Sequence, residues 1–217
     1  MDRETLGREA ILRGITGSQA YGMATPSSDI DIFGIFVRPT RQLLGFQKGE
    51  ASYCFTAPDA TYHELGRFCE LCLNGNPTAI EFLWLESYLQ KTEEGERLLG
   101  LREKFLSKRV KNAYVGYVYS QLQLFGRGDN QARKEKNIRH CFRLLEQAEI
   151  LFATGKLVLK VRNKEEIFAL AQQDGASILA TIKERLEKIK SMKDVLPEVP
   201  DETSIEDFLI ELRRKNF

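Results

Sequence analysis

Residues 16–37 read TGSQAYGMATPSSDIDIFGIFV, and this stretch sets the expectation for the rest of the chain. The mostly apolar run over 10–16 stops at the Gly17-Ser18 pair, which predicts a strand that ends in a turn. After the loop residues around Pro26, a run rich in Ile, Phe and Val over 29–37 predicts a second strand. The N-terminal part is therefore expected to contain a sheet.

Two carboxylates stand at the start of that second strand. Residues i and i+2 of a strand share a face, so Asp29 and Asp31 are expected to point one way, while Ile30 and Ile32 point into the core. Carboxylates this close repel each other unless a cation lies between them. Oxygen ligands without a nearby His or Cys suit Mg²⁺ or Mn²⁺. The residues alone leave open an exposed strand with a solvated acidic face.

Ten residues separate the Gly17-Ser18 pair from Asp29. Glycine lets the backbone approach a ligand closely, and the N–H groups of such a turn can hold phosphate oxygens. Ser18 adds a hydroxyl donor, and Gly22 is a second glycine in the same loop. A plain turn is the alternative, but a glycine turn and a carboxylate pair that each adjoin an apolar strand together favour a nucleotide and metal site.

The remaining chain changes from mixed to helical pattern. Two more short strands are expected over 52–56 and 59–62, and helices over 65–73 and 78–84. Beyond residue 92 the pattern predicts helices over 93–107, 109–126, 132–153, 164–172, 176–192 and 204–215. The expected fold class is α+β, with a small mixed sheet and flanking helices over residues 1–91 and a helical domain over residues 92–217.

Composition narrows the class of protein. The chain has 217 residues, 42% hydrophobic residues and a net charge of +1, which excludes intrinsic disorder. Four cysteines are too few for a disulfide framework, so a reduced cytoplasmic setting is expected. No apolar run approaches the ~20 residues of a membrane span, and the charged N-terminus does not resemble a secretory signal.

Charge is distributed unevenly along the chain. Residues 1–100 have a net charge of −5, residues 101–143 of +8 and residues 144–217 of −2. The near-neutral total therefore conceals a strongly basic segment, which is suited to a polyanionic ligand. Solvated helix faces that meet the acidic segments are the alternative explanation, and charge alone does not choose between them.

The motif in residues 16–37 resembles a known signature. Gly17-Ser18, ten residues and then Asp29-Ile30-Asp31 are similar to the signature of the DNA polymerase beta superfamily of nucleotidyltransferases. The whole stretch resembles the RNA-repair-pathway branch of that superfamily (RlaP, with YcgL-like relatives). The likeness continues through residues 76–84, 136–145, 151–157 and 196–201.

The resemblance implies a chemistry and a fold like that of polymerase beta. In the superfamily the Gly-Ser turn, here Gly17 and Ser18 with Tyr21 close by, binds a nucleoside triphosphate (NTP). The paired carboxylates, here Asp29 and Asp31, hold two Mg²⁺ (or Mn²⁺) ions. The expected activity is metal-dependent transfer of a nucleoside monophosphate from an NTP to an acceptor hydroxyl, which the resemblance makes an RNA or tRNA end under repair. A protein side chain, as in toxin-neutralising enzymes, a small molecule, and an inactive nucleotide- or RNA-binding module remain alternatives.

Superfamily members also carry a third carboxylate on a neighbouring strand. We choose Asp59, which leads the short run over 59–62, as the third catalytic and metal-binding residue. Glu64 is the second choice, and Glu50 and Glu81 are further options. An Asp that follows a proline is often only a turn residue, which is the alternative for Asp59.

A basic stripe lies in the segment that matches the family. Lys136, Arg139, His140 and Arg143 have the spacing of one helix face. Arginine binds phosphate oxygens in bidentate fashion, so the stripe is expected to bind the triphosphate or a nucleic-acid end. The alternative is the solvated face of an amphipathic helix. The spacing of Cys69 and Cys72 is that of a metal or redox pair, but their apolar helix face predicts buried thiols instead.

Overall fold

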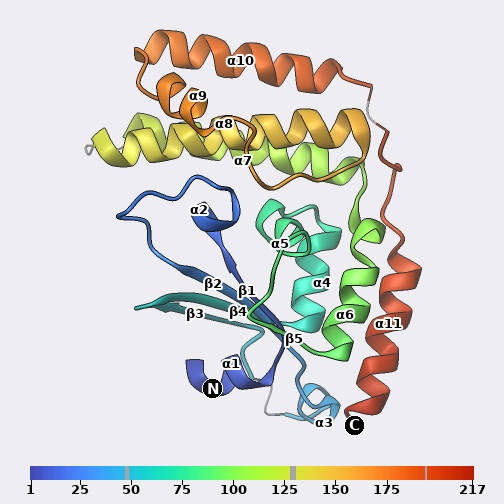
Figure 1. Cartoon of the computed structure of the whole chain (residues 1–217). Helices are drawn as coiled ribbons and strands as arrows, with labels where there is room; N and C mark the ends of the chain where they lie inside the picture. Colours follow the sequence, from blue (N-terminus) through green and yellow to red (C-terminus); the bar gives the residue numbers. More distant parts are fainter. Residues whose placement is uncertain (47–48, 128–130, 194) are drawn as a thin grey trace.

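The computed structural model describes residues 1–46, 49–127, 131–193 and 195–217 (Figure 1). Its sheet has five strands in the order β3-β4-β2-β1-β5. The strands are β1 (Ala10–Thr16), β2 (Asp31–Phe36), β3 (Ser52–Thr56), β4 (Asp59–Glu64) and β5 (Gln90–Lys91). The sequence pattern predicted the first four, whereas β5 is too short to leave a periodic signal.

The described strands pair antiparallel except for β2 and β4, which are parallel. In that parallel pair Ile32 lies opposite Ala60. Because parallel strands begin at the same edge of a sheet, the first residues of β2 and β4 lie next to each other. Those first residues are Asp31 and Asp59.

Helices make up most of the remaining described chain. They are α1 (Arg3–Glu9), α2 (Gly17–Ala20), α3 (Thr40–Leu44), α4 (Leu65–Leu73), α5 (Pro77–Phe82), α6 (Glu93–Gly100), the 3-10 helix η1 (Arg102–Phe105), α7 (Lys108–Arg127), α8 (Gln131–Thr154), α9 (Lys164–Leu170), α10 (Gly175–Ser191) and α11 (Glu202–Lys215). The expected α+β class, a mixed sheet with flanking helices and a helical C-terminal region, is confirmed.

The two faces of the sheet bury different side chains. Phe33 and Ile35 of β2 join the main core, which includes side chains of α4, α5 and α6. Phe36 joins Leu6 of α1 and Tyr62 of β4 in a smaller cluster. The alternation of side chains along β2 produces these two faces. The main core supports the edge of the sheet at which β2 and β4 begin.

The main core extends from the sheet into the helical region. In that region α7 packs along α8, and α10 packs on the other side of α8. Helix α11 returns to α4, where Arg213 forms an ion pair of 2.5 Å with the buried Glu64. The boundary between residues 91 and 92 stays a prediction. No helix within the described residues combines the length and apolar character that a membrane span needs.

One expectation about the carboxylate strand is wrong. Strand β2 begins at Asp31, so Asp29 lies in the loop before it. Ile30 is 53% exposed and does not point into the core. The loop over residues 21–30 departs from the sheet until Asp31 pairs with Thr16 of β1. The two carboxylates are therefore placed by a loop and a strand, and not by one pleated strand.

Candidate active site

The turn after β1 brings the backbone against Asp31. Gly17 has a φ of +66°, and a Cβ atom on it would lie 2.0 Å from Oδ2 of Asp31. Thr16 donates its hydroxyl to the backbone oxygen of Asp31 at 3.3 Å. Only glycine combines this backbone conformation with that lack of volume. The Gly-Ser turn and the Asp31 carboxylate are thus in direct contact.

The charge of Asp31 is influenced by the other two predicted carboxylates. Burial raises the pKa of Asp31, the negative charges of Asp59 and Asp29 raise it further, and the positive charge of Lys136 opposes them. All three carboxylates line one cavity. Their mutual repulsion in a partly dry site is the condition that a bound cation relieves.

The other candidates for the third carboxylate are occupied elsewhere. Glu64 caps α4 by accepting from the N–H of Gly66 and pairs with Arg213. Glu81 is buried in a separate ion pair, and neither Glu64 nor Glu81 lines the cavity. Glu50 is exposed and is also absent from the cavity wall. The geometry favours Asp59, whose role as a metal ligand stays a prediction.

The basic stripe of α8 runs from solvent into the interior. Lys136 is exposed, and the guanidinium of Arg139 lies 4.4 Å from the ring centre of Phe168 in α9. His140 is half-buried, while Arg143 is only 1% exposed. All four side chains of the stripe line the same cavity as the carboxylates. The stripe is therefore neither a uniform binding face nor a solvated one.

Arg143 is the centre of a buried polar network. Its Nη1 donates to Oε1 of Glu81 at 2.9 Å and to Gln147 at 2.6 Å. The hydroxyls of Tyr21 and Tyr114 also donate to the Glu81 carboxylate, at 2.6 and 3.1 Å. The guanidinium of Arg143 lies 3.7 Å from the ring centre of Tyr21. The polar groups of Tyr21 and Arg143 that were expected to contact a nucleotide are thus engaged with Glu81.

Sequence reasoning considered Glu81 only as a possible metal ligand. A glutamate within the apolar run Ala79-Ile80-Glu81-Phe82-Leu83 has few explanations other than a buried cationic partner. That signal was present in the sequence. The identity of the partner was not, because Arg143 is 62 residues away along the chain.

The cavity between the sheet edge and α8 has a volume of about 910 Å³. Its walls include every candidate site residue: Gly17, Ser18, Tyr21, Asp29, Asp31, Asp59, Lys136, Arg139, His140 and Arg143. Arg67 of α4 adds a further cation. A wall that carries separate groups of carboxylates and cations matches a polyphosphate that is bound together with divalent metal.

The carboxylates of the cavity are the candidate metal ligands. Among the residues that the structure describes, no group of three or more His, Cys, Asp or Glu side chains is arranged around one ion position. Asp31 and Asp59 nevertheless begin adjacent strands, and the charge of Asp59 acts on Asp31. Carboxylate oxygens of this kind fit Mg²⁺ or Mn²⁺. The chemistry of the donors therefore fits the ion.

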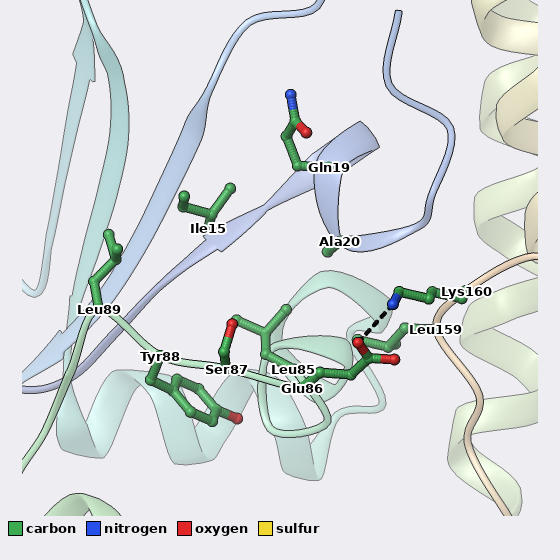
Figure 2. Close-up of a pocket in the computed structure, with 10 residues that line it drawn as sticks. All are labelled: Ile15, Gln19, Ala20, Leu85, Glu86, Ser87, Tyr88, Leu89, Leu159 and Lys160. Carbon is green, nitrogen blue, oxygen red and sulfur yellow. Dashed lines mark hydrogen bonds and ion pairs between the residues drawn. The ribbon is translucent and has the colours of Figure 1, made fainter.

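A second, smaller cavity of about 310 Å³ uses Gln19 and Ala20 of α2 (Figure 2). Lys160 and Glu86 in its wall form an exposed ion pair of 2.6 Å, which is the dashed contact in Figure 2. The charges of these two side chains cancel. This cavity lacks the separated charges that distinguish the larger one.

The thiols and the second histidine are buried to different degrees. Cys69 and Cys72 are buried in the core, which confirms the prediction of buried thiols, and burial raises the pKa of the Cys69 thiol to about 12. His63 lies in the cavity wall, with its Nδ1 at 2.7 Å from the Ser52 hydroxyl. His63 precedes Glu64, which is the residue that caps α4.

The two histidines of the chain predict how stability depends on pH. Burial and the charge of Arg67 lower the pKa of His63 to about 4, and burial also lowers the pKa of His140. Unfolded histidine binds a proton near pH ~6.5. The unfolded state therefore binds more protons between pH 6.5 and 4, and the free energy of unfolding falls as the pH falls through that window.

Urea unfolding at several pH values measures this slope. His63→Gln is expected to reduce the slope by less than the ~1.4 kcal/mol per pH unit that one fully buried histidine gives, because His63 is only half-buried. Equal slopes for the two proteins between pH 6.5 and 4 would contradict the lowered pKa of His63.

The sequence of the chain was compared with known families and proteins. The sequence model of RlaP, the RNA repair pathway DNA polymerase beta family, matches residues 3–211. The chain belongs to this family. The resemblance seen in residues 16–37 is thereby confirmed, and it places the chain in a polymerase-beta-like nucleotidyltransferase family.

Relatives of this RlaP chain include an uncharacterized 38.9 kDa protein of Enterobacteria phage T4 from the nrdC-mobD intergenic region. The two are 28% identical over 205 residues, which cover 88% of this chain and 53% of the phage protein. The RlaP chain thus spans about half the length of that curated relative. A crystal structure of a nucleotidyltransferase-like protein from Exiguobacterium sibiricum 255-15 is 13% identical, with a TM-score of 0.36 over 98% of this chain and 77% of that protein.

Proposed function

We propose that the protein transfers a nucleoside monophosphate from an NTP to a hydroxyl at an RNA or tRNA end, in a reaction that depends on Mg²⁺ or Mn²⁺. The observation that carries the proposal is the 910 Å³ cavity, which places three carboxylates and the Gly17-Ser18 turn opposite the basic stripe of α8. RlaP membership supports both the reaction class and the nucleic-acid acceptor.

The residues take distinct roles in this reaction. Gly17 and Ser18 hold the polyphosphate through the backbone and a hydroxyl, and Lys136 and Arg139 neutralise its charge. Tyr21 and Arg143 both donate hydrogen bonds to the buried Glu81 and so hold the wall of the cavity in place. The acceptor hydroxyl oxygen forms a bond to the α-phosphorus, the bond to the leaving pyrophosphate breaks, and the hydroxyl proton passes to water.

Asp29, Asp31 and Asp59 would hold the divalent ions. Asp29 and Asp31 would bind both ions, and Asp59 would complete the site of the ion next to the acceptor hydroxyl. Two such ions supply activation of the attacking hydroxyl and stabilise charge on the leaving group. Of the three carboxylates, Asp31 is the one that contacts Gly17 of the turn, and its charge interacts with that of Asp59. We therefore expect Asp31 to act on both the nucleotide and the acceptor.

The test is transfer of label from each α-³²P-labelled NTP, with Mg²⁺ or Mn²⁺, to total RNA, to purified tRNA and to the protein itself. We expect label in RNA for the wild type and none for the variant Asp29→Asn with Asp31→Asn. Label on protein alone would overturn the RNA acceptor. Absence of label from every acceptor, or equal transfer by the variant, would overturn the catalytic proposal.

Gly17→Ala tests the contact between the turn and Asp31. The added methyl meets Oδ2 of Asp31, so the carboxylate must move, and displacements of this kind cost about 100-fold in rate. Gly22→Ala is the matched control: Gly22 has a φ of +68°, yet its Cβ would meet only the Lys160 side chain at 3.9 Å. Both variants are expected to lose about 1–2 kcal/mol of stability from backbone strain.

The label-transfer assay and urea unfolding separate the two effects. Only Gly17→Ala is expected to lose transfer activity beyond what its stability explains. Equal activity of the two alanine variants would show that the Gly17 contact with Asp31 has no role in catalysis.

A further inference from the structure

The ring of His140 is held from behind by the buried network. Its Nε2 lies 3.2 Å from Nη2 of Arg143, whose Nη1 is bound to Glu81 and Gln147. The bonds of Nη1 fix the orientation of the guanidinium, so Nη2 is held toward His140. His140 itself lines the 910 Å³ cavity, one helical turn beyond Lys136.

That contact determines which nitrogen of His140 carries the proton. A guanidinium has only donors, so Nε2 must accept the hydrogen bond from Arg143 and cannot itself be protonated. Burial, followed by the positive charges of Arg143 and Lys136, lowers the pKa of His140 well below its ordinary value. A neutral imidazole whose Nε2 accepts carries its hydrogen on Nδ1.

The Nδ1 atom is available to a ligand. It has no hydrogen-bond partner among the residues that the structure describes, and it is not among their buried unpartnered polar atoms, so it is accessible. The Tyr117 ring packs edge-on against the imidazole, with centroids 5.5 Å apart at an angle of 89°, and limits its rotation. Because His140 lines the 910 Å³ cavity, a ligand bound there is the candidate partner for this N–H.

We propose that His140 is a neutral hydrogen-bond donor, fixed as the Nδ1–H tautomer by Arg143, and that it donates to a polyphosphate oxygen of the bound nucleotide. The inference rests on the proposed function for its ligand but not for its tautomer. Lys136 precedes His140 by one turn on the same side of α8 and carries the charge that attracts the polyphosphate. His140 adds a directional hydrogen bond without adding charge, and the Glu81–Arg143 pair holds its imidazole ring in place.

The tautomer can be observed directly. The chain has only two histidines, so a two-bond ¹H–¹⁵N correlation spectrum contains two imidazole patterns, and His63→Gln identifies the pattern of His140. At pH 7 we expect His140 to show a protonated Nδ1 and an unprotonated Nε2. A protonated Nε2, or an imidazolium with both nitrogens protonated, would overturn the proposal.

The ligand contact is tested by two substitutions. The amide nitrogen of His140→Asn stands near the position of Nδ1 and can donate in its place, whereas His140→Leu keeps volume but donates nothing. Calorimetric titration uses a nonhydrolysable ATP analogue and inorganic tripolyphosphate as probes, both with Mg²⁺. His140→Leu is expected to bind both probes about tenfold more weakly, and His140→Asn within about threefold of the wild type.

Each outcome of the titration decides a different point. Equal losses in the two variants would overturn the Nδ1 donor. A loss for the ATP analogue alone would move the contact to the base or ribose and overturn the polyphosphate assignment. A wild type that binds neither probe would overturn the proposed function and the ligand contact together, while the spectrum still decides the tautomer. Circular dichroism confirms that both variants fold.

Discussion

Asparagine at position 31 is expected to abolish nucleotidyl transfer and yet to raise the melting temperature of the metal-free protein. The loss of activity, more than roughly 1,000-fold, follows from the proposed role of Asp31 as a carboxylate that would bind both metal ions. The gain in stability follows from the pKa of Asp31, which burial and the charges of Asp59 and Asp29 raise.

The raised pKa of Asp31 means that its negative charge is unfavourable in the folded protein. A folded-state pKa above the unfolded value means that the folded protein holds the Asp31 proton more tightly than the unfolded chain does. Stability is therefore lost as the pH rises from the unfolded pKa of Asp31 through its folded pKa. Asparagine carries no charge, so the variant avoids this cost.

Calorimetry of the metal-free protein at pH 7, followed by addition of Mg²⁺, tests both effects. Mg²⁺ should raise the melting temperature of the wild type and leave that of Asp31→Asn unchanged. Asp207→Asn, an exposed position on α11, is the matched control and should alter neither stability nor transfer. A lower melting temperature for metal-free Asp31→Asn would contradict the unfavourable charge at position 31.

Glu81→Gln is expected to cause the largest loss of stability. The substitution leaves Arg143 with an uncompensated charge at 1% exposure. Removing one partner of a buried ion pair costs about 3–5 kcal/mol, which corresponds to roughly 6–20 °C for a chain of this length. Tyr21 and Tyr114 also lose the charge-assisted character of their hydrogen bonds to position 81.

A double-mutant cycle separates this charge effect from loss of packing. Glu81→Gln combined with Arg143→Met should be less destabilised than the sum of the two single variants, because no unpaired charge remains. Glu86→Gln disrupts the exposed pair with Lys160 and should cost at most ~1 kcal/mol. Additive effects of the substitutions at positions 81 and 143 would disprove the coupling.

The local parts of the site were predictable from sequence, because they depend on neighbouring residues. The turn at Gly17-Ser18 and the carboxylate at Asp31 each adjoin an apolar strand, and that pattern survives in the structure. Asp59 was chosen as the start of a short strand, which it is. The parallel pairing that brings Asp59 beside Asp31 has no local signature.

The fates of individual basic side chains were not predictable. The spacing of the stripe on α8 is right, but periodicity gives only a direction around the helix axis. It does not reveal that Tyr21 and α5 cover the C-terminal end of the stripe and bury Arg143, while Lys136 stays exposed. The expectation for Ile30 failed for a related reason. The strand alternation was extended to Ile30, but that residue lies in a loop that pairs with no strand.

The buried pair of Glu81 and Arg143 also sets an order of events during synthesis. Glu81 leaves the ribosome 62 residues before Arg143, so the emerging chain carries a glutamate that is destined for the interior and lacks its cation. Burying that charge alone is costly, so burial of Glu81 is disfavoured until α8 has been made. Tyr21 donates to the same carboxylate. The wall of the 910 Å³ cavity includes Lys136, Arg139 and Arg143 of α8, so the cavity is complete only after the chain up to α8 has been made.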